Sequence, residues 1–482
     1  MSKFSEKCKQ LLSENGSNVY RISKSASLER TALQRMVTGK RLPSQDIVKS
    51  FCQALRISFS EEQELMELYK MELIGLSAYK NQKCIFRLFE HLTELEKMNA
   101  QASRNVIDNS DLVLVSPVSN HSYDTELLLH FIFKKVFQLE NDSVIYTNLP
   151  GTNKLLSHHL SLLSSTPVSK VIIKHLILFH SNVADTFENL EILNQVLPLC
   201  FLDGIAYEPY YYYSKFSVND QENLLFPYYI ITPEYVLQLS CNFKRGILHS
   251  DSSIVQQYID EFKRSLTHAF PLIYKPDTLD DAMNRYSATT PPREIFSLES
   301  APCDSDLFSQ ELFEKLANRH FSSNLPLLEQ YTALVSHLLC GPKRTQFFTR
   351  QGFEKFSKRG IGSGTSQMLF PPLEPEVRLE ALQYFSDTYE NSIKHMLNDD
   401  FVFPQSLYLE LRDNCILHFI HLGDKNHISF VSIAENSICN AFFEFFQILE
   451  KSEYLYPEEE LKSLLSETIN TFKNALNSRV GG

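Results

Sequence analysis

Residues 26–44, ASLERTALQRMVTGKRLPS, form the most informative stretch of this 482-residue chain. Apolar residues recur in it at the three- and four-residue spacing of one helical face, and they are Leu28, Ala32, Leu33, Met36 and Val37. This spacing predicts a helix over about residues 28–38. Gly39 ends that helix, because glycine readily adopts the left-handed backbone found at helix C-termini. Pro43 stands at the opening of the next helix, where a proline is tolerated.

The rest of the first 75 residues is also predicted to be helical. Apolar spacing and capping signals predict helices over residues 3–14, 19–25 and 44–55, and from Ser60 onward, where Ser60 and Gln63 fit a capping box. Asn18 is a good N-cap for the second of these helices. A tight turn separates helix 19–25 from helix 28–38. The pair therefore has the arrangement of a helix–turn–helix, whose second helix lies in the major groove of DNA.

Charge distinguishes this head from the remainder of the chain. The first 58 residues contain eleven Lys and Arg against four Asp and Glu, a net charge of +7. The whole chain carries −12, so the other 424 residues sum to −19. A small basic segment on a large acidic one is typical of a tethered nucleic-acid reader. The acidic remainder disfavours broad coating of DNA, so we expect DNA contact to be confined to the head.

Residues 33–44, LQRMVTGKRLPS, resemble part of the lambda-repressor-like (Xre) DNA-binding domain. In that family a similar apolar-polar-basic-apolar run leads into Gly-Lys-Arg-x-Pro-Ser. The resemblance covers about an eighth of the chain and implies a five-helix DNA-binding domain. The chain departs from the family pattern at Val19, Ser23 and Glu29, where Gln, Ala and a capping Ser or Thr are usual.

The resemblance and the helical geometry together imply which residues contact DNA. Four residues on the outer face of the recognition helix are the predicted base contacts: Arg30, Thr31, Gln34 and Arg35. Arginine pairs with guanine and glutamine with adenine through two hydrogen bonds. Four residues are the predicted phosphate contacts: Asn18, Lys24, Lys40 and Arg41. The alternative is that these are solvated surface groups on a helical bundle that binds protein.

Residues 76–110 are predicted to be a connecting helix and a linker. Within helix 78–98, apolar residues alternate at spacings of three and four, as in a coiled coil: Ile85, Leu88, Leu92 and Leu95. Two alternatives are open, a helix packed on the body of the chain and a contact between two copies of the chain. Repressors that bind paired half-sites need two heads, which favours a homodimer. Ala102 to Ser110 is the predicted linker.

Beyond residue 110, short apolar runs alternate with helical patterns. This alternation predicts an α/β unit over 111–275, beginning with strand 112–115 and including a helix opened by Pro233. Residues 276–308 are rich in Pro, Ser, Thr and Asp and are predicted to be a linker. An α+β unit follows over 309–482, with helices near 326–340 and 375–397 and a hairpin at 423–426. The predicted fold class is thus multidomain: an all-α helix–turn–helix head and a large α/β or α+β body.

Candidate chemistry in the body is sparse. The glycine-rich run 360–366, GIGSGTS, lacks the Lys of a phosphate-binding loop and is predicted to be a flexible loop. Two histidine pairs, 158–159 and 418/421, lack completing ligands, so no metal and no cofactor are expected. A basic segment precedes the glycine-rich run and has two interpretations, a solvated loop and a site for an anion or a second stretch of DNA. Its charged residues are Lys343, Arg344, Arg350, Lys355, Lys358 and Arg359.

The run EPYYYY (208–213) concentrates aromatic surface on a predicted strand. Alternation places Tyr210 and Tyr212 on one face of that strand and Tyr211 and Tyr213 on the other. One face is expected to be core. Tyr210 and Tyr212 are the candidate ligand-binding residues of the body, because aromatic walls with few polar groups suit small molecules.

The compartment and the function follow from these observations. Nine cysteines without Cys-x-x-Cys spacing, no apolar leader and no long apolar run predict a cytoplasmic protein without membrane contact. The predicted function is a DNA-binding transcriptional regulator that binds double-stranded DNA as a homodimer. Its body senses a small-molecule or protein effector, and no enzymatic activity is expected, because no catalytic motif is present. One alternative is an interaction scaffold whose head binds protein, and another is an enzyme with an accessory DNA-binding head.

Overall fold

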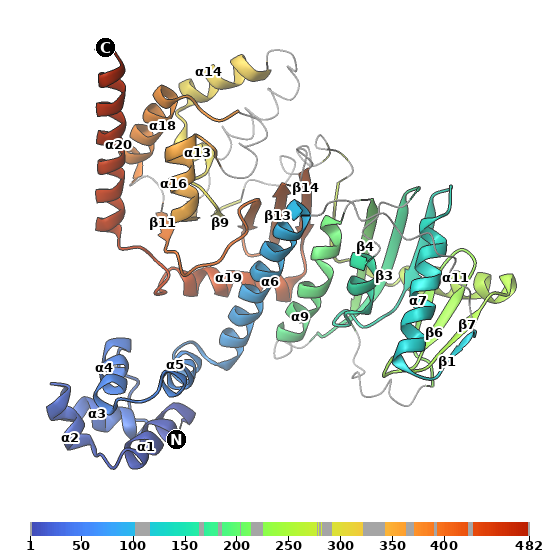
Figure 1. Cartoon of the computed structure of the whole chain (residues 1–482), viewed down its shortest axis with the longest axis horizontal. Coiled ribbons are helices and arrows are strands. Elements are labelled where there is room, and N and C mark those ends of the chain that lie inside the picture. The colour runs from blue at the N-terminus through green and yellow to red at the C-terminus, as the bar shows by residue number, and fades with distance from the viewer. Residues whose placement is uncertain are drawn as a thin grey trace. The chain divides into compact units, whose positions relative to one another are not determined.

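Two compact units divide the chain, Met1–Lys83 and Cys84–Gly482 (Figure 1). The computed structural model describes residues 2–101, 116–162, 168–181, 186–202, 204–213, 225–276, 278, 281, 292–321, 343–362, 371–389, 393–422 and 428–480. The first unit is helical and the second combines sheets with helices, which confirms the predicted multidomain fold class. Five predicted features lie outside the described residues: the linker 102–110, strand 112–115, helix 326–340, most of the glycine-rich loop (363–366) and the turn 423–426.

The head, described over residues 2–83, contains a bundle of five short helices. They are α1 (Lys3–Glu14), α2 (Val19–Ser25), α3 (Arg30–Val37), α4 (Gln45–Leu55) and α5 (Phe59–Ile74). Their apolar faces meet in one core, which includes Phe4, Leu11, Leu33, Phe51 and Leu65. The ring of Tyr69 meets Phe4 edge to face at 5.6 Å, and its hydroxyl donates to the Pro43 carbonyl at 3.0 Å. Tyr69 thereby fixes α5 against the segment that follows the predicted recognition helix.

The fifth helix begins earlier than predicted, because Ser58 rather than Ser60 caps it. Ser58 Oγ accepts a hydrogen bond from the Glu61 backbone N–H at 3.3 Å, and the Glu61 carboxylate accepts one from the Ser58 N–H at 2.8 Å. Both serines fit the capping-box pattern. The two boxes differ in the side chain that accepts the N–H of the capping serine: the charged Glu61 carboxylate for Ser58 and the neutral Gln63 amide for Ser60. The charge-assisted bond is the stronger one, which favours the box at Ser58.

α6 (Leu76–Gln101) begins in the head unit and continues into the body unit. Along its body segment, Ile85, Leu88 and Leu92 are each 1% exposed within the body core, and Leu95 packs against the same core. The interpretation of this face as a dimer contact is therefore wrong. Three-and-four spacing identifies an apolar face but not the surface that covers it, and here the same chain covers it.

Within the described residues, the first body sheet has eight strands in the order β1-β7-β6-β5-β2-β3-β4-β8. Their bounds are β1 (Val118–Ser119), β2 (Ser143–Thr147), β3 (Val171–Phe179), β4 (Ile205–Tyr213), β5 (Tyr228–Ile231), β6 (Val236–Leu239), β7 (Gly246–His249) and β8 (Phe270–Pro271). Strands β2, β3 and β4 are parallel, and β5, β6 and β7 form an antiparallel meander beside β2. The associated helices are α7 (Ser122–Phe137), α8 (Leu155–Leu162), α9 (Thr186–Val196), the 3₁₀ turn η2 (Pro198–Phe201) and α11 (Ser252–Leu266).

No helix begins at Pro233 in this described stretch, so that prediction is wrong. Residues 232–235 instead form the turn of a hairpin between β5 and β6. The Thr232 N–H donates to the Tyr235 carbonyl at 2.8 Å, and Thr232 Oγ1 accepts from the Tyr235 N–H at 3.0 Å. The next residues, Val236 to Leu239, pair with β5 and bury Val236, Leu237 and Leu239 in the sheet. Sheet pairing thus overrides the helix-start signal of the proline.

The second body sheet has six strands within the described residues, in the order β11-β10-β9-β12-β13-β14. Their bounds are β9 (Glu294–Glu299), β10 (Lys343–Thr349), β11 (Ile393–Leu397), β12 (Leu407–Arg412), β13 (Ile416–Leu422) and β14 (Ile428–Ile433). The helices of this region are α13 (Asp304–Leu307), α14 (Gln310–Phe321), α16 (Arg350–Arg359), α18 (Pro375–Asp387), α19 (Asn436–Leu449) and α20 (Glu458–Val480).

Three parts of this sheet contradict the predictions. β9 and α13 lie inside the predicted linker 276–308, and β10 and α16 occupy the predicted basic loop. The predicted helix 375–397 ends at Asp387, and its last five residues form β11. The strands were missed because they carry polar residues that are nevertheless buried. Gln346 of β10, for example, is fully buried and donates to the Glu299 carboxylate of β9 at 3.1 Å.

The two sheets share one topology. In each, three parallel strands joined by helices are followed by an antiparallel meander that pairs beside the first parallel strand. A helix follows each meander, α11 in the first sheet and α19 in the second. The body is therefore built from two copies of one supersecondary pattern. One hydrophobic core, to which α6 and α19 also contribute side chains, joins the two sheets.

One face of the second sheet is apolar and the other is charged. The apolar face packs against phenylalanines of α19, including Phe442 and Phe446. On the opposite face, strand register places polar residues in one row across five strands: Gln346, Ser297, Glu410, His418 and Ser432. Tyr408 and Arg412 lie on the same face as Glu410, because side chains two residues apart on a strand share a face.

Candidate nucleic-acid interface

The turn between α2 and α3 sets the geometry of the head. Ser27 adopts the left-handed backbone conformation, with φ of 53°. The Ala26 N–H donates to the Ile22 carbonyl at 2.9 Å, and the Leu28 N–H donates to the Ser23 carbonyl at 3.0 Å. These bonds close the end of α2 and redirect the chain into α3. Ile22 and Leu33 are both buried in the head core, so the two helices are locked to each other.

Replacing Ser27 by glycine is expected to stabilise the head by up to about 1 kcal/mol, because glycine adopts a left-handed backbone without the penalty that a Cβ brings. The measurement is hydrogen exchange of the α2–α3 amides in the full chain, which should slow. Ser25→Gly is the matched control. Ser25 lies in the helical part of α2, so glycine there should speed exchange, and equal behaviour of the two variants would contradict the prediction.

α3 presents the predicted base-contact residues to solvent. Leu33, Met36 and Val37 are its buried side chains. Its exposed side chains include all four predicted base contacts: Arg30, Thr31, Gln34 and Arg35. The helix has no side-chain N-cap hydrogen bond at Glu29, the position where the Xre pattern has a capping residue. The first-turn N–H groups of α3 therefore lack the side-chain acceptor that Ser or Thr would supply.

The C-terminus of α3 places two cations directly after the recognition helix. Gly39 has φ of 69°; its N–H donates to Met36 at 3.0 Å, and the Lys40 N–H donates to the Arg35 carbonyl at 2.9 Å. This is a Schellman motif, which ends a helix and turns the chain sharply. Lys40 and Arg41 follow at once, and both are exposed. Their place beyond the helix end suits contact with phosphates rather than with bases.

Asn18 caps α2, and Lys24 and Arg30 lie over the Tyr20 ring of the same helix. The Asn18 side chain accepts from the Arg21 N–H at 2.9 Å, so it caps α2 while remaining exposed. Lys24 Nζ lies 4.9 Å and Arg30 Cζ 5.7 Å from the centre of the Tyr20 ring. Tyr20 is half exposed and holds the two cations at the surface through cation–π contacts. Tyr20 was missed at the sequence level, where an exposed aromatic beside basic residues was the available signal.

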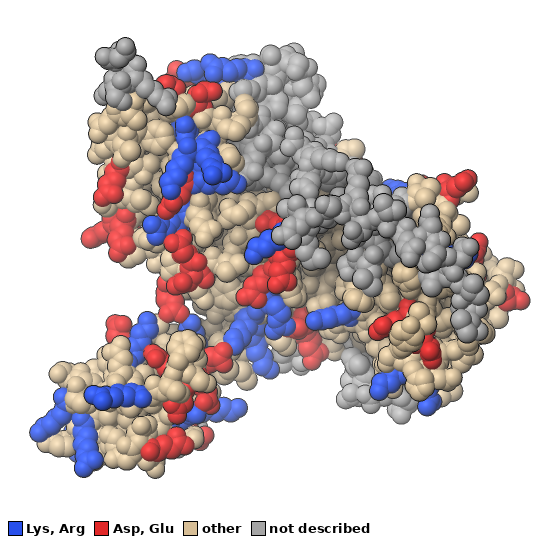
Figure 2. All heavy atoms as spheres, in the orientation of Figure 1, with Lys and Arg blue, Asp and Glu red and all other residues tan. Residues whose placement is uncertain are grey.

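Charge is distributed unevenly over the head. The whole unit, residues 1–83, has fourteen Lys and Arg against nine Asp and Glu, a net charge of +5. Five of the nine acidic residues belong to α5: Glu61, Glu62, Glu64, Glu67 and Glu72. Figure 2 shows basic side chains gathered at the end of the head that α2 and α3 form. The positive potential is therefore concentrated on the helix–turn–helix and weakened by α5.

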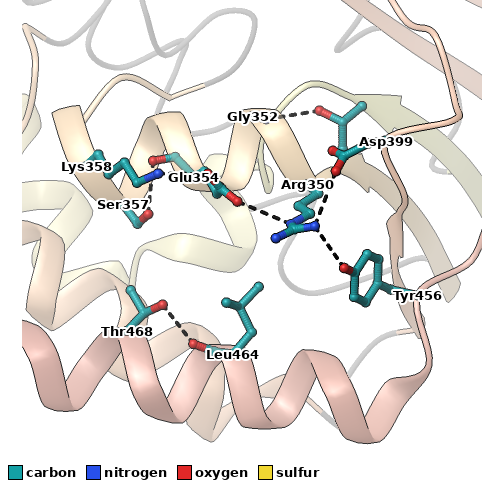
Figure 3. Close-up of polar contacts among 10 residues, drawn as sticks. Arg350, Gly352, Glu354, Ser357, Lys358, Asp399, Tyr456, Leu464 and Thr468 are labelled. Carbon is teal, nitrogen blue, oxygen red and sulfur yellow. Dashed lines mark hydrogen bonds and ion pairs between the residues drawn. The ribbon is translucent and has the colours of Figure 1, made fainter.

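Most cations of the basic segment of the body pair with carboxylates of the same chain. Arg350 begins α16 and makes ion pairs with Glu354 and Asp399, both at 3.2 Å, and it donates to the Tyr456 hydroxyl at 3.0 Å (Figure 3). Lys358 pairs with Glu354 at 2.8 Å in the same view. Two further pairs join Lys343 to Glu294 at 2.9 Å and Arg344 to Asp306 at 3.4 Å, so four of the six cations of this segment are ion-paired within the described residues. These cations connect elements of the body, which weighs against their use for an anion or for DNA.

The two candidate tyrosines of the body lie on one face of β4, as predicted from the alternation. Tyr210 and Tyr212 both pack against a small core formed with α11, which includes Val255 and Phe262. The Tyr210 hydroxyl donates to the Glu208 carboxylate at 3.1 Å, and burial together with that carboxylate raises the pKa of Tyr210 to about 12. Tyr210 is thus engaged in packing. Tyr212 also lines a cavity at the end of the sheet.

Comparisons with known proteins place no family on this chain. No protein-family model matches it, and no curated protein matches its sequence. Among solved structures it is similar to TrmBL2, whose structure is described as that of an archaeal chromatin protein with a novel mode of DNA binding. The identity is 14% and the TM-score 0.22, over 50% of this chain and 82% of that one. A similarity this low says nothing about the function of this chain.

Within the described residues, no helix is long and apolar enough to span a membrane.

Proposed function

We propose that this protein is a DNA-binding transcriptional regulator of the Xre type, and that α3 reads base edges in the major groove. The observation that carries the proposal is the two-sided character of α3. Its buried side chains fix it in the bundle, while Arg30, Thr31, Gln34 and Arg35 are exposed along one helix. Arginine and glutamine are the side chains that pair with guanine and adenine through two hydrogen bonds.

The flanking cations support the same assignment. Lys40 and Arg41 follow the end of α3, and Lys24 is held beside Arg30 by Tyr20. Phosphate contacts on both sides of a recognition helix fix its register on the duplex. Asn18, which caps the N-terminus of α2, is the remaining proposed phosphate contact.

We further propose that the protein acts as a homodimer, because a helix–turn–helix of this kind reads paired half-sites about one DNA turn apart. The contact between copies is not the apolar face of α6, which is buried inside the chain. The body would sense a small molecule or a partner protein and alter DNA affinity, as a cytoplasmic regulator without catalytic activity does. Such an effector must bind more tightly to one arrangement of the paired heads than to another.

The test is selection of bound genomic fragments by the full-length protein, followed by titration of the enriched fragment at several salt concentrations. Three phosphate-binding cations per head, in a dimer, give a slope of about −5 for the logarithm of the affinity against the logarithm of the salt concentration. Absence of enrichment, or affinity that does not change with salt, would rule out the regulator and leave the interaction scaffold. In that case the same exposed residues would be a protein-binding surface.

A further inference from the structure

The body contains a cavity that the head's function does not explain. It has a volume of about 500 Å³ and lies where β2 and β3 end. The parallel strands run from β2 toward β4, after which the chain returns to place β5 on the other side of β2. The connections therefore change direction at β2. Crevices outside the carboxyl ends of strands at such a switch point are where open α/β sheets bind ligands.

The floor of this cavity is rigid. The loop that follows β2 is held by His175, whose Nε2 donates to the Leu149 carbonyl at 2.7 Å. The other ring nitrogen accepts from the Tyr207 hydroxyl at 2.7 Å, and burial lowers the pKa of His175 to about 4, so the ring stays neutral. Gly151 of the same loop has no room for a side chain, since a Cβ would lie 2.6 Å from Ile192 and 2.8 Å from Ile177. The cavity is thus preformed by packing.

The walls combine apolar and aromatic side chains with a few charges. Leu176, Leu178 and Ile192 supply aliphatic surface, and three aromatic rings face the cavity: Phe187, Tyr212 and Tyr228. A cavity of this size and composition suits a small organic molecule, since such sites are mostly apolar with few polar groups.

The cavity lining has more Asp and Glu than Lys and Arg side chains. Arg87 is bound by both carboxylate oxygens of Glu191, at 2.7 and 2.9 Å, so these two charges neutralise each other. Glu188 pairs with His180 at 2.9 Å, and its side chain is 54% exposed. Arg87, Glu188 and Glu191 contribute one positive and two negative formal charges to the lining, a sum of −1.

We propose that this cavity binds a small organic cation, whose ammonium group pairs with Glu188 and whose apolar body fills the space between the aromatic rings and Leu178. Aromatic faces attract ammonium groups through their quadrupoles, and a nearby carboxylate supplies the counter-charge. An anion would have to displace Glu191 from Arg87 and would face Glu188 as well. The lining therefore favours a cation over an anion or a neutral molecule.

The cavity is connected to the helix that leaves the head. Arg87 lies on α6, and α6 is further bound to α9 by Asn194, whose side-chain amide donates to the Cys84 carbonyl at 3.0 Å. α6 and α9 lie side by side in Figure 1. A ligand between α9 and Arg87 would thus act on the helix that continues into the head. The role of the cavity as an effector site rests on the proposed function. Binding of a cation to the cavity is independent of that function.

The test measures, by calorimetry, the binding of benzyltrimethylammonium to the full-length protein. Benzyl alcohol and benzoate are measured beside it, since both share its ring but the first is neutral and the second is an anion. We expect the cation to bind with a Kd of about 1 mM, because a molecule with so few atoms makes few contacts. Benzyl alcohol and benzoate should bind at least tenfold more weakly. Glu188→Gln should weaken the cation at least tenfold. Glu261→Gln, an exposed glutamate on α11, is the matched control and should leave the affinity unchanged.

Equal or tighter binding of benzoate or benzyl alcohol would overturn the proposal, as would no binding of the cation, or equal weakening by Glu188→Gln and Glu261→Gln. A second readout adds the cation to the DNA titration. A cation that binds without changing DNA affinity would leave the site in place and remove its regulatory role. Loss of DNA binding altogether would remove the regulator and leave the calorimetric result standing.

Discussion

Arg35→Ala should weaken binding to the preferred DNA sequence by about 10- to 100-fold and relax the preference at one base position, because a two-bond arginine–guanine contact contributes about 1–3 kcal/mol of discrimination. Arg35 is exposed in the last turn of α3, and its backbone carbonyl, not its side chain, receives the Lys40 N–H. The substitution should therefore leave the fold of the head intact. The measurement is affinity for a library of single-base variants of the enriched fragment.

Lys40→Ala should behave differently from Arg35→Ala. A phosphate contact carries no base information, so its loss should weaken all sequences alike and reduce the salt slope by about 1 per head. Lys244→Ala provides the control, since it makes the same change on an exposed hairpin of the body. The assignment of roles on α3 would be lost if Arg35→Ala and Lys40→Ala changed sequence preference and salt slope in the same way.

Glu410→Ala should lower the free energy of unfolding of the body by about 3–5 kcal/mol, since it leaves a buried guanidinium without its carboxylate. Glu410 is fully buried on β12, and its carboxylate accepts from Arg412 Nε at 2.5 Å and from the Tyr408 hydroxyl. Arg412 is itself only 3% exposed. Urea unfolding followed by circular dichroism measures the loss. Glu458→Ala, which removes an exposed partner of Lys462, is the control and should cause no comparable loss.

The paired replacement tests whether the charge is the cause. Glu410→Met combined with Arg412→Leu removes both charges and should recover most of the lost stability, because a buried ion pair can be replaced by apolar groups of similar volume. A double variant as unstable as Glu410→Ala would show that shape, rather than the unpaired charge, explains the loss.

The pH dependence of the body gives an independent check on Glu410. Burial acts to raise the pKa of this carboxyl, but Arg412, His418 and the Tyr408 hydroxyl outweigh it and hold the pKa below its ordinary value of 4.5. A depressed folded pKa stabilises the protein above the unfolded pKa, and this contribution is lost as the pH falls through the folded pKa. The wild type should therefore lose stability in acid more steeply than the double variant does.

Regular elements with clean apolar patterns were predictable from the sequence. The run 208–213 lies on a strand, β4, as predicted, and the five helices of the head lie within a few residues of their predicted bounds. In each, the period of the apolar residues matches the period of the element that buries them. Exposure of Arg30, Thr31, Gln34 and Arg35 followed from the same period, once Leu33, Met36 and Val37 were assigned to the core.

Other elements could not be predicted, because their polar residues are buried by partners distant in the chain. β9 was predicted to be a linker, yet its Ser297 lies in the middle of a sheet, opposite Gln346 on one side and Glu410 on the other. The apolar face of α6 carried no sign of what would cover it. The cavity likewise draws residues from α6, α9 and the ends of β2 and β3, segments that sequence spacing does not relate.

By itself the sequence determined the helical fold of the head, because its turn, caps and apolar period are local and lie within about 40 consecutive residues. It also determined the sign of each unit's charge. Only the tertiary structure decided that α6 belongs to the body core, that Arg350 is paired with carboxylates of its own chain, and that a cavity forms at the ends of β2 and β3. Those features depend on which segments meet in space, and side-chain burial and ion pairing are properties of such meetings.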